Sequence, residues 1–338
     1  MAAGSSDTAA RPELTLPGYR ALGEDVAVYR DGARRVLRVT GERAPAMLQG
    51  LVTADIADPG DGAAWPSLIL NPKGRVLADA VIVRVDGLTL LDVPEASRTA
   101  LDAHLDRYLP PRFAALEPTE LAVFRVRGPR AIAAAGEVPS LAAIAAPVES
   151  PDAGVRCHAL RFGEGAAVRV DDATGEGLDL YLAAEDPAYL EAMEGVPRVA
   201  DEAWEIWRIE RGVPLYGRDF GEDNLPQETG LVSATTSFTK GCYTGQEVLA
   251  RIHYRGKVNR RLVGLRLADG AAGGLEAGQR LLSGEREIGA VTSAARSPRI
   301  GWIGLGYARR EVEAGSEVCV ETSETSARIV ALPFPSDD

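Results

Sequence analysis

The sequence predicts an α+β protein of two or three domains that ends in a small β-barrel. The chain has 338 residues, which is too many for one ordinary hydrophobic core. Segments with strand patterns alternate with helical ones, and Asp86-Gly87 is a strong signal for a two-residue hairpin turn. This alternation with hairpins favours α+β domains over a parallel doubly wound sheet. From Arg260 onward, short strands alternate with glycine turns and helical periodicity is absent, as is typical of a barrel.

The first part of the chain reads as strands with two helices between them. Thr40 can cap a short helix that runs through Leu48 and ends at Gly50. Pro94 can open a longer helix whose leucines recur every four residues. Alternating or continuous apolar runs predict strands over residues 26–29, 36–39, 67–70, 76–85, 88–93 and 121–126.

The second part begins with a stretch rich in alanine, proline and serine, residues 131–153, which has room for one short helix and a loop. Strands are then expected over 156–162, 167–170 and 178–182, and a short helix over 187–194. The barrel strands are expected over residues 262–267, 280–282, 287–292, 300–307, 317–320 and 327–331.

A predicted helix that Asp201 caps carries a carboxylate on its apolar face. Ala203, Ile206 and Trp207 share one face, and Glu210 follows Ala203 by seven residues, so it lies on that face too. A carboxylate among apolar side chains must find hydrogen-bond donors, because burial without them is costly. Two readings stay open at this point: Glu210 pairs with an internal arginine, or it binds the donor-rich edge of a ligand.

Residues 237–247 contain a cysteine just before a predicted helix start. Thr244 and Glu247 have the spacing of a capping box, so Cys242 would lie near the positive end of a helix dipole. Lys240 stands two residues earlier, and both features favour thiolate over thiol. The alternative is that Cys242 is a small buried hydrophobe.

Composition narrows the function classes. The net charge of −12 and the isoelectric point of about 4.9 argue against a general nucleic-acid binder. No apolar run is long enough to span a membrane, and residues 1–17 lack the pattern of a secretion signal, so we expect a loose tail there. The three cysteines are far apart and form no zinc pattern with the three histidines, which favours reduced thiols in a cytoplasmic protein without a metal site.

Three parts of the sequence together resemble the YgfZ-type folate-binding proteins, which are relatives of the aminomethyltransferase (T-protein) of the glycine cleavage system. The resemblance extends over about residues 26–334, and its most specific part is KGCYTGQE at residues 240–247. The other matching segments are WRIERGVP at 207–214, PQETGL at 226–231, LQGLVTAD at 48–55 and NPKGR at 71–75.

The resemblance implies a three-domain cloverleaf around a central channel that holds a tetrahydrofolate. The first domain would be discontinuous, made of residues 20–70 and 154–257, with a second α+β domain at 71–153 inserted between them. The barrel would occupy residues 258–335, and residues 1–19 would form the loose tail.

The resemblance also assigns residues to the folate. Glu210 matches the carboxylate that holds the pterin in the family, and a carboxylate can accept two neighbouring N–H groups side by side. Further candidates for contacts with the folate tail or rings are Lys240, Tyr243, Arg251, Arg255, Lys257 and Tyr254.

Two functions follow from the resemblance. The first is a tetrahydrofolate-binding accessory protein for iron–sulfur cluster assembly or repair, with Cys242 as the reactive thiol and with client enzymes or assembly proteins as partners. The alternative is a folate-dependent aminomethyltransferase in which Asp79 and Glu210 are the working carboxylates. T-proteins carry two adjacent aspartates where this chain has Ala78 and Asp79, which argues against the transferase.

Overall fold

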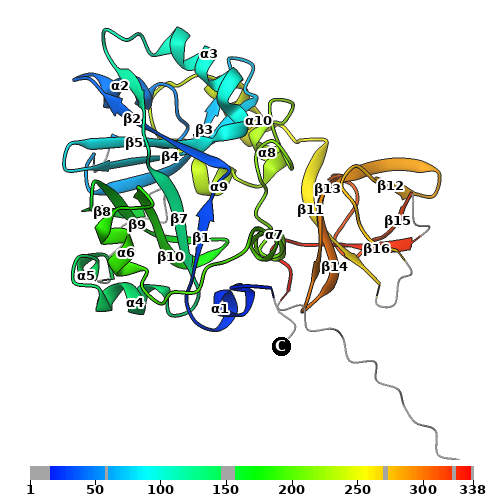
Figure 1. The fold of residues 1–338 in the computed structure, drawn as a ribbon. Helices are drawn as coiled ribbons and strands as arrows, with labels where there is room; N and C mark the ends of the chain where they lie inside the picture. The colour runs from blue at the N-terminus through cyan, green and yellow to red at the C-terminus, as the bar shows by residue number, and fades with distance from the viewer. Residues whose placement is uncertain (1–15, 58–59, 146–156, 269–272, 322–324, 336–338) are drawn as a thin grey trace, which may run out of the picture.

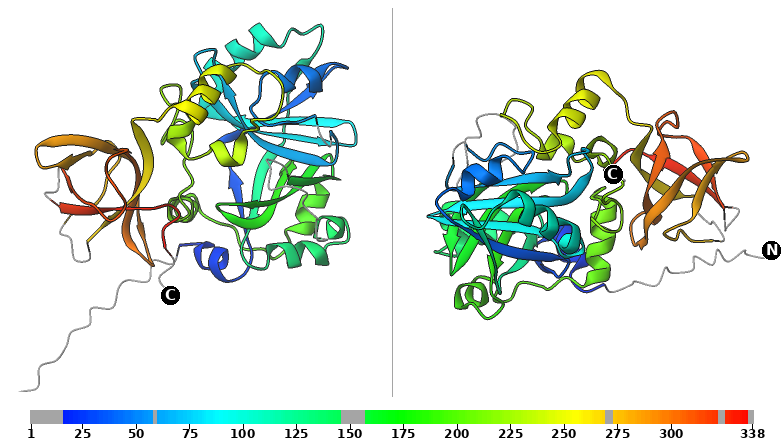
Figure 2. Two further views of the ribbon diagram at one scale, coloured as in Figure 1. Left: turned by 180° about the vertical axis from the view of Figure 1, so that it is seen from behind. Right: turned by 90° about the horizontal axis from the view of Figure 1, so that it is seen from above.

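The computed structural model describes residues 16–57, 60–145, 157–268, 273–321 and 325–335. These residues form a large body built on one ten-stranded sheet and a smaller closed barrel beside it, with helix α7 (Asp201–Glu210) between the two (Figures 1 and 2). The predicted α+β class and the C-terminal barrel are therefore confirmed. Within the described ranges, no helix is both long enough and apolar enough to cross a membrane.

The large sheet is antiparallel throughout and has the strand order β1-β7-β10-β9-β8-β3-β4-β5-β2-β6. Strands β8 and β3 share only two residue pairs, and on either side of this narrow junction lie five strands. The two halves pack face to face, because one apolar cluster contains Val83 and Leu90 from one half and Val168 and Tyr181 from the other. The strands are β1 (Ala27–Asp31), β2 (Arg34–Thr40), β3 (Ala63–Leu70), β4 (Val76–Val85), β5 (Leu88–Pro94), β6 (Ala115–Pro118), β7 (Ala122–Arg127), β8 (Cys157–Phe162), β9 (Gly165–Asp172) and β10 (Gly175–Leu182).

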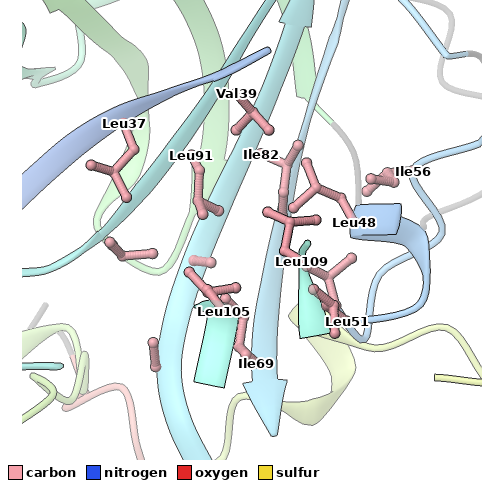
Figure 3. Close-up of a cluster of buried hydrophobic side chains, with 14 of the residues drawn as sticks. Leu37, Val39, Leu48, Leu51, Ile56, Ile69, Ile82, Leu91, Leu105 and Leu109 are labelled. Carbon is pink, nitrogen blue, oxygen red and sulfur yellow. The ribbon is translucent and has the colours of Figure 1, made fainter. Parts of the chain in front are cut away.

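Helices cover the outer faces of both halves. Helices α2 (Ala44–Gln49) and α3 (Arg98–Tyr108) pack on the half that contains β3, β4 and β5, where Leu48 and Leu105 are fully buried (Figure 3). Helices α4 (Ala131–Glu137), α5 (Ala142–Ala145) and α6 (Pro187–Ala192) cover the half that contains β7, β9 and β10. The result is a layered body with helices outside and two sheet faces inside.

The barrel closes in the order β11-β14-β13-β12-β15-β16 around its own apolar core. Its strands are β11 (Arg260–Leu267), β12 (Arg280–Ser283), β13 (Arg286–Ser297), β14 (Gly301–Arg309), β15 (Glu317–Val320) and β16 (Thr325–Val330). The remaining helices are α1 (Tyr19–Glu24), α8 (Pro226–Thr229), α9 (Val232–Thr235) and α10 (Gln246–Arg255). The predicted boundaries of the other domains stay a prediction.

The predicted hairpin at Asp86-Gly87 is confirmed. Both residues have positive φ, 48° and 74°, as a turn of type I′ requires, and the turn joins β4 to β5. Several features escaped the sequence analysis. They include the short helices α1, α8 and α9, a second helix (α5) in the stretch 131–153 where one was expected, and the edge strand β6, whose sequence ALEP ends in proline.

All three predicted N-caps are wrong. Helix α2 is preceded by Arg43 rather than Thr40, and α7 by Ala200 rather than Asp201. Helix α10 begins after Gly245, which has a φ of 82°, and no side chain caps it, so the box of Thr244 and Glu247 does not form. The N–H of Thr244 instead donates to the carbonyl of Gly50, which draws this residue out of the capping position.

The helix predicted to open at Pro94 starts later. Pro94 is the last residue of β5 and pairs with Arg34 across the sheet. A single 3₁₀ turn, Glu95–Ser97, intervenes before α3 begins at Arg98. The ladder of the sheet therefore decides the conformation of this proline.

Candidate functional site

Glu210 is a buried carboxylate with one oxygen in use and one free. It is the last residue of α7 and only 3% exposed. Its Oε1 accepts hydrogen bonds from the hydroxyls of Tyr19, at 2.6 Å, and Ser297. Its Oε2 has no hydrogen-bond partner. Nη1 of the half-exposed Arg299 lies 3.8 Å from this oxygen. The carboxylate thus stands where α1, α7 and the end of β13 meet.

The free oxygen is the feature of this site that points to a ligand. A buried acceptor without a donor raises the free energy of the folded state by about 1–3 kcal/mol. A ligand N–H placed against Oε2 would remove that penalty. The alternative that Glu210 pairs with an internal arginine is supported only by the long contact with Arg299. A further donor therefore fits against Oε2.

The rest of α7 is bound firmly to the barrel. Arg208, also buried, donates to Asp219 at 2.8 Å, to Glu205 at 2.6 and 2.7 Å and to Ser293 Oγ in β13 at 2.7 Å. The backbone N–H of Phe334 also donates to the carbonyl of Glu210. The position of the Glu210 carboxylate is therefore fixed by contacts on both sides.

Lys240 is buried and links its own loop to the end of α2 and the segment after it. Its Nζ donates to the backbone carbonyls of Gln49, Val52 and Ala54, at 2.7, 2.9 and 2.6 Å, and the residue is 7% exposed. Burial lowers the pKa of Lys240 to about 8, and the charge of Asp55 opposes this. All three donors of the ammonium group are in use, so this geometry gives no support to the predicted contact of Lys240 with the folate.

The three hydrogen bonds of Lys240 hold the loop that carries Cys242 against the end of α2 and the segment after it. Cys242 is exposed, so the reading of this residue as a buried hydrophobe is wrong. Tyr243, next to it, is buried beside Tyr216 and Phe220, with Lys240 Nζ 5.1 Å from its ring centre. Its hydroxyl has no hydrogen-bond partner, and burial raises its pKa to about 12. The loop therefore turns one side chain into the core and presents the thiol to solvent.

Helix α10 presents an exposed surface that follows this loop. Tyr254 is 68% exposed, and His253 stacks on Phe238 with ring centres 3.8 Å apart. Arg251 and Arg255 are exposed and have no ion-pair partner within the part of the chain that the structure describes. Lys257 lies just beyond the helix and is exposed too. The predicted folate contacts of Arg251, Arg255 and Tyr254 stay a prediction.

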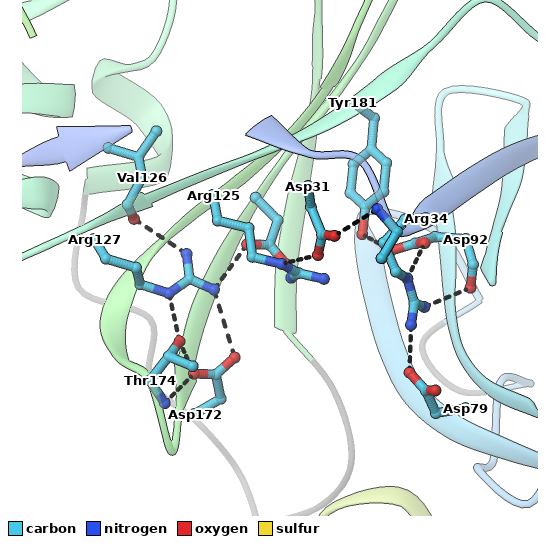
Figure 4. A network of polar contacts seen from close by, with 12 residues as sticks. Asp31, Arg34, Asp79, Asp92, Arg125, Val126, Arg127, Asp172, Thr174 and Tyr181 are labelled. Atoms are coloured by element: carbon cyan, nitrogen blue, oxygen red, sulfur yellow. Dashed lines mark hydrogen bonds and ion pairs between the residues drawn. The ribbon is translucent and has the colours of Figure 1, made fainter. Parts of the chain in front are cut away.

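Asp79 takes part in an ion-pair network between the two halves of the sheet (Figure 4). Its carboxylate pairs with Arg34, which is buried and also donates to Asp92 Oδ1 at 2.7 Å. The side chain of Asp79 is 27% exposed. Burial raises the pKa of Tyr216 to about 12, and the negative charges of Glu222 and Asp79 act in the same direction. Further members of the network are Asp31, Arg125, Arg127, Asp172, Thr174, Asp179 and Tyr181.

The predicted site residues belong to three different structural elements. Glu210 lies at the junction with the barrel, Asp79 lies in the network of the sheet, and Cys242 lies on the exposed loop before α10. Tyr19 and Ser297, which both donate to Oε1 of Glu210, were missed because they lie 191 and 87 residues from Glu210 in the sequence. In the described part of the chain, no group of His, Cys, Asp or Glu is arranged to hold a metal ion.

Comparison with known proteins shows which family the chain belongs to. Residues 260–335 match the model of the glycine cleavage T-protein C-terminal barrel domain. An aminomethyltransferase from Saccharopolyspora erythraea is 30% identical over 88% of this chain and 83% of its own length. The chain belongs to the aminomethyltransferase family.

Two further relatives refine this picture. The human protein named iron–sulfur cluster assembly factor IBA57, mitochondrial, is 32% identical over 75% of this chain and 69% of its own length. The crystal structure of the glycine cleavage system aminomethyltransferase T from Bartonella henselae matches with a TM-score of 0.77 at 22% identity. That match covers 94% of this chain and 88% of the other, and the predicted T-protein type of fold is thereby confirmed.

Proposed function

We propose that this family member is a YgfZ-type, tetrahydrofolate-binding accessory protein that supports the assembly or repair of iron–sulfur clusters in client enzymes. The observation that carries the proposal is the exposed Cys242 on a loop that Lys240 fastens with three hydrogen bonds. The similarity to a protein named as an iron–sulfur cluster assembly factor supports the class of partner. We also place the protein in the cytoplasm, where thiols stay reduced.

The thiol would act on a macromolecular partner. It lies at the surface, close in sequence to the exposed tyrosine and cations of α10, so another protein can reach it without entering a closed cavity. A reactive thiol of this kind can exchange with a disulfide or hold a sulfur species or cluster transiently. Iron–sulfur client enzymes or assembly proteins are the partners that this chemistry fits.

The folate would be held at Glu210. A pterin presents adjacent N–H donors, and the free Oε2 is a buried acceptor that needs one. Because Oε1 already accepts from Tyr19 and Ser297, we expect the ligand to approach from the side of Oε2 and Arg299. Tetrahydrofolate, when bound, would supply a carrier for one-carbon groups.

Aminomethyl transfer is the second candidate, favoured by the family relatives of that name. Its working carboxylate would be Asp79, but Arg34 already holds that side chain in an ion pair. Ala78, where T-proteins carry another aspartate, is fully buried in an apolar cluster. The site therefore offers less carboxylate chemistry than this reaction needs.

Folate binding is tested by titrating tetrahydrofolate while following tryptophan fluorescence, since Trp204 and Trp207 lie on the same helix as Glu210. We expect saturable binding by the wild type, and binding at least about tenfold weaker for Glu210→Gln. The control is Glu317→Gln, an exposed barrel carboxylate, which should bind like the wild type. Equal affinity of all three proteins would remove Glu210 from the site.

The thiol is tested in a strain that lacks the protein. Cys242→Ser should fail to restore the activity of iron–sulfur enzymes, whereas Cys319→Ser, which changes the exposed barrel thiol, should restore it. Full restoration by Cys242→Ser would exclude the proposed role of the thiol. Separately, incubation with tetrahydrofolate and an aminomethyl-lipoyl carrier should give no methylene-tetrahydrofolate above background; clear turnover would favour the transferase.

A further inference from the structure

A groove of about 880 Å³ lies along the edge strand β1, apart from Glu210 and Cys242. Its walls come from β1, the start of β2, the loop after β6, the segment before α7, and Tyr189 of α6. The groove reaches Asp201 at the first residue of α7, whereas Glu210 is the last. A helix rise of about 1.5 Å per residue separates these two ends by roughly 14 Å.

The backbone register places two arginines on one face of this edge. The segment around Arg198 runs beside β1 as a parallel bridge, with Val28 N donating to Pro197 O and Val199 N donating to Val28 O, both at 2.9 Å. Paired residues in a sheet project to the same face, and so do residues two apart in one strand. Arg198, Val28 and Arg30 therefore share a face.

Tyr189 lies on that same face. Val28 belongs to the apolar cluster of Tyr189 and Phe124, and the rings of Tyr189 and Phe124 stack with centres 4.1 Å apart. Tyr189 is only 2% exposed, and its hydroxyl is buried without a hydrogen-bond partner. Burial raises the pKa of this hydroxyl, and the charges of Arg198 and Arg30 act in the opposite direction. Both charged groups that act on the hydroxyl are thus cations.

The other charged walls of the groove are mostly in use. Arg34 and Arg35 are held by Asp92 and Asp102, and Asp31 is held by Arg125. The exposed Glu120, on the loop after β6, and Asp201 are the remaining carboxylates of the lining. Within the described ranges, Arg30 and Arg198 have no ion-pair partner, and both are exposed.

We propose that Arg30, Arg198 and the hydroxyl of Tyr189 form a binding site for a phosphate monoester. Two unpaired guanidinium groups match a group that carries close to two negative charges near neutral pH. The planar fork of arginine suits phosphate oxygens, and the tyrosine hydroxyl adds a neutral donor that has no other use. The site does not depend on the proposed function, because neither Glu210 nor Cys242 takes part in it.

The test is calorimetric titration of the full chain with inorganic phosphate and with glycerol 3-phosphate, at constant ionic strength. Citrate in the same buffer serves as the carboxylate arm. Arg30→Ala and Arg198→Ala should each weaken phosphate binding about tenfold or more, because each removes a charged donor. Tyr189→Phe should weaken it about three- to tenfold and should leave folding intact, because the lost hydroxyl has no partner in the fold.

A matched control is Arg286→Ala, which removes an exposed barrel arginine far along the sequence from the groove and should bind phosphate like the wild type. Absence of saturable phosphate binding by the wild type would overturn the proposal. Equal affinity of the three groove variants and the wild type would also overturn it. Binding of citrate in preference to both phosphates, with the same sensitivity to the variants, would replace the phosphate site by a carboxylate site.

Discussion

Replacing Lys240 with methionine should loosen the loop that presents Cys242. Methionine fills most of the same volume but has no donor, so the carbonyls of Gln49, Val52 and Ala54 would lose their hydrogen bonds together. These carbonyls belong to the last residue of α2 and to the turn after it, and the ammonium group adds three hydrogen bonds to the backbone bond from Thr244 N–H to the Gly50 carbonyl that also joins the two segments. The variant therefore tests a tertiary contact between residues 48–55 and residues 240–247, two of the segments that carry the family resemblance.

The magnitude follows from two opposing terms. Hydrogen bonds to a charged group contribute about 1.5–3 kcal/mol each, so three of them stabilise the fold by about 4.5–9 kcal/mol. Against this stands the cost of burying the ammonium group, which lowers the pKa of Lys240 from 10.5 to about 8 and corresponds to roughly 3 kcal/mol. The difference leaves a net loss of at least about 1 kcal/mol for Lys240→Met, and about 3 kcal/mol is our central expectation.

The assay is urea unfolding followed by tryptophan fluorescence, combined with the rate at which Cys242 reacts with a thiol reagent in the native protein. Lys257→Met is the control, since Lys257 is exposed and should change neither quantity. We expect a lower free energy of unfolding and a faster thiol reaction for Lys240→Met. A decrease in the free energy of unfolding well below 1 kcal/mol, with an unchanged rate of thiol reaction, would refute the reasoning. The three hydrogen bonds would then stabilise neither the fold nor the loop.

Two more outcomes follow from burial. In the native protein, the exposed Cys242 and Cys319 should react quickly with Ellman's reagent, whereas Cys157, whose pKa burial raises to about 12, should react only on unfolding; three equally fast thiols would contradict this. His104 is buried beside Tyr108, and burial lowers its pKa below 6.5, so the unfolded chain takes up the proton first as the pH falls. Stability should therefore decrease below about pH 6.5 by at most about 1.4 kcal/mol per pH unit. In urea titrations His104→Phe should lack this component, and identical pH profiles would exclude it.

The sequence predicted the elements well where a local pattern decides them. The hairpin at Asp86-Gly87 formed because Asp-Gly accepts the two positive φ angles of a type I′ turn, whose geometry matches the twist of β4 and β5. The barrel strands were found from their alternation and glycine turns. The helix starts failed because partners distant in sequence intervene: the N–H of Thr244 is taken by Gly50, and Pro94 stays in the ladder of β5.

The candidate site shows the same division between local and distant information. The apolar stripe of α7 was sufficient to predict that Glu210 is buried and needs donors. It could not name Tyr19 or Ser297, which come from α1 and β13. The role of Lys240 was beyond prediction, because its acceptors are backbone carbonyls and every residue has one.

The solvent exposure of the Glu210 carboxylate, the Asp79 carboxylate and the Cys242 thiol bears on the choice between the candidate functions. A group-transfer enzyme gains from excluding water around all its reacting groups. In this chain the free oxygen of Glu210 is buried, Asp79 is tied to Arg34, and the thiol of Cys242 faces solvent. Glu210 therefore offers a buried acceptor to a small ligand, and Cys242 offers a thiol that another protein can reach. That arrangement is the one we expect of the proposed accessory protein, because a fold alone does not decide which chemistry a family member performs.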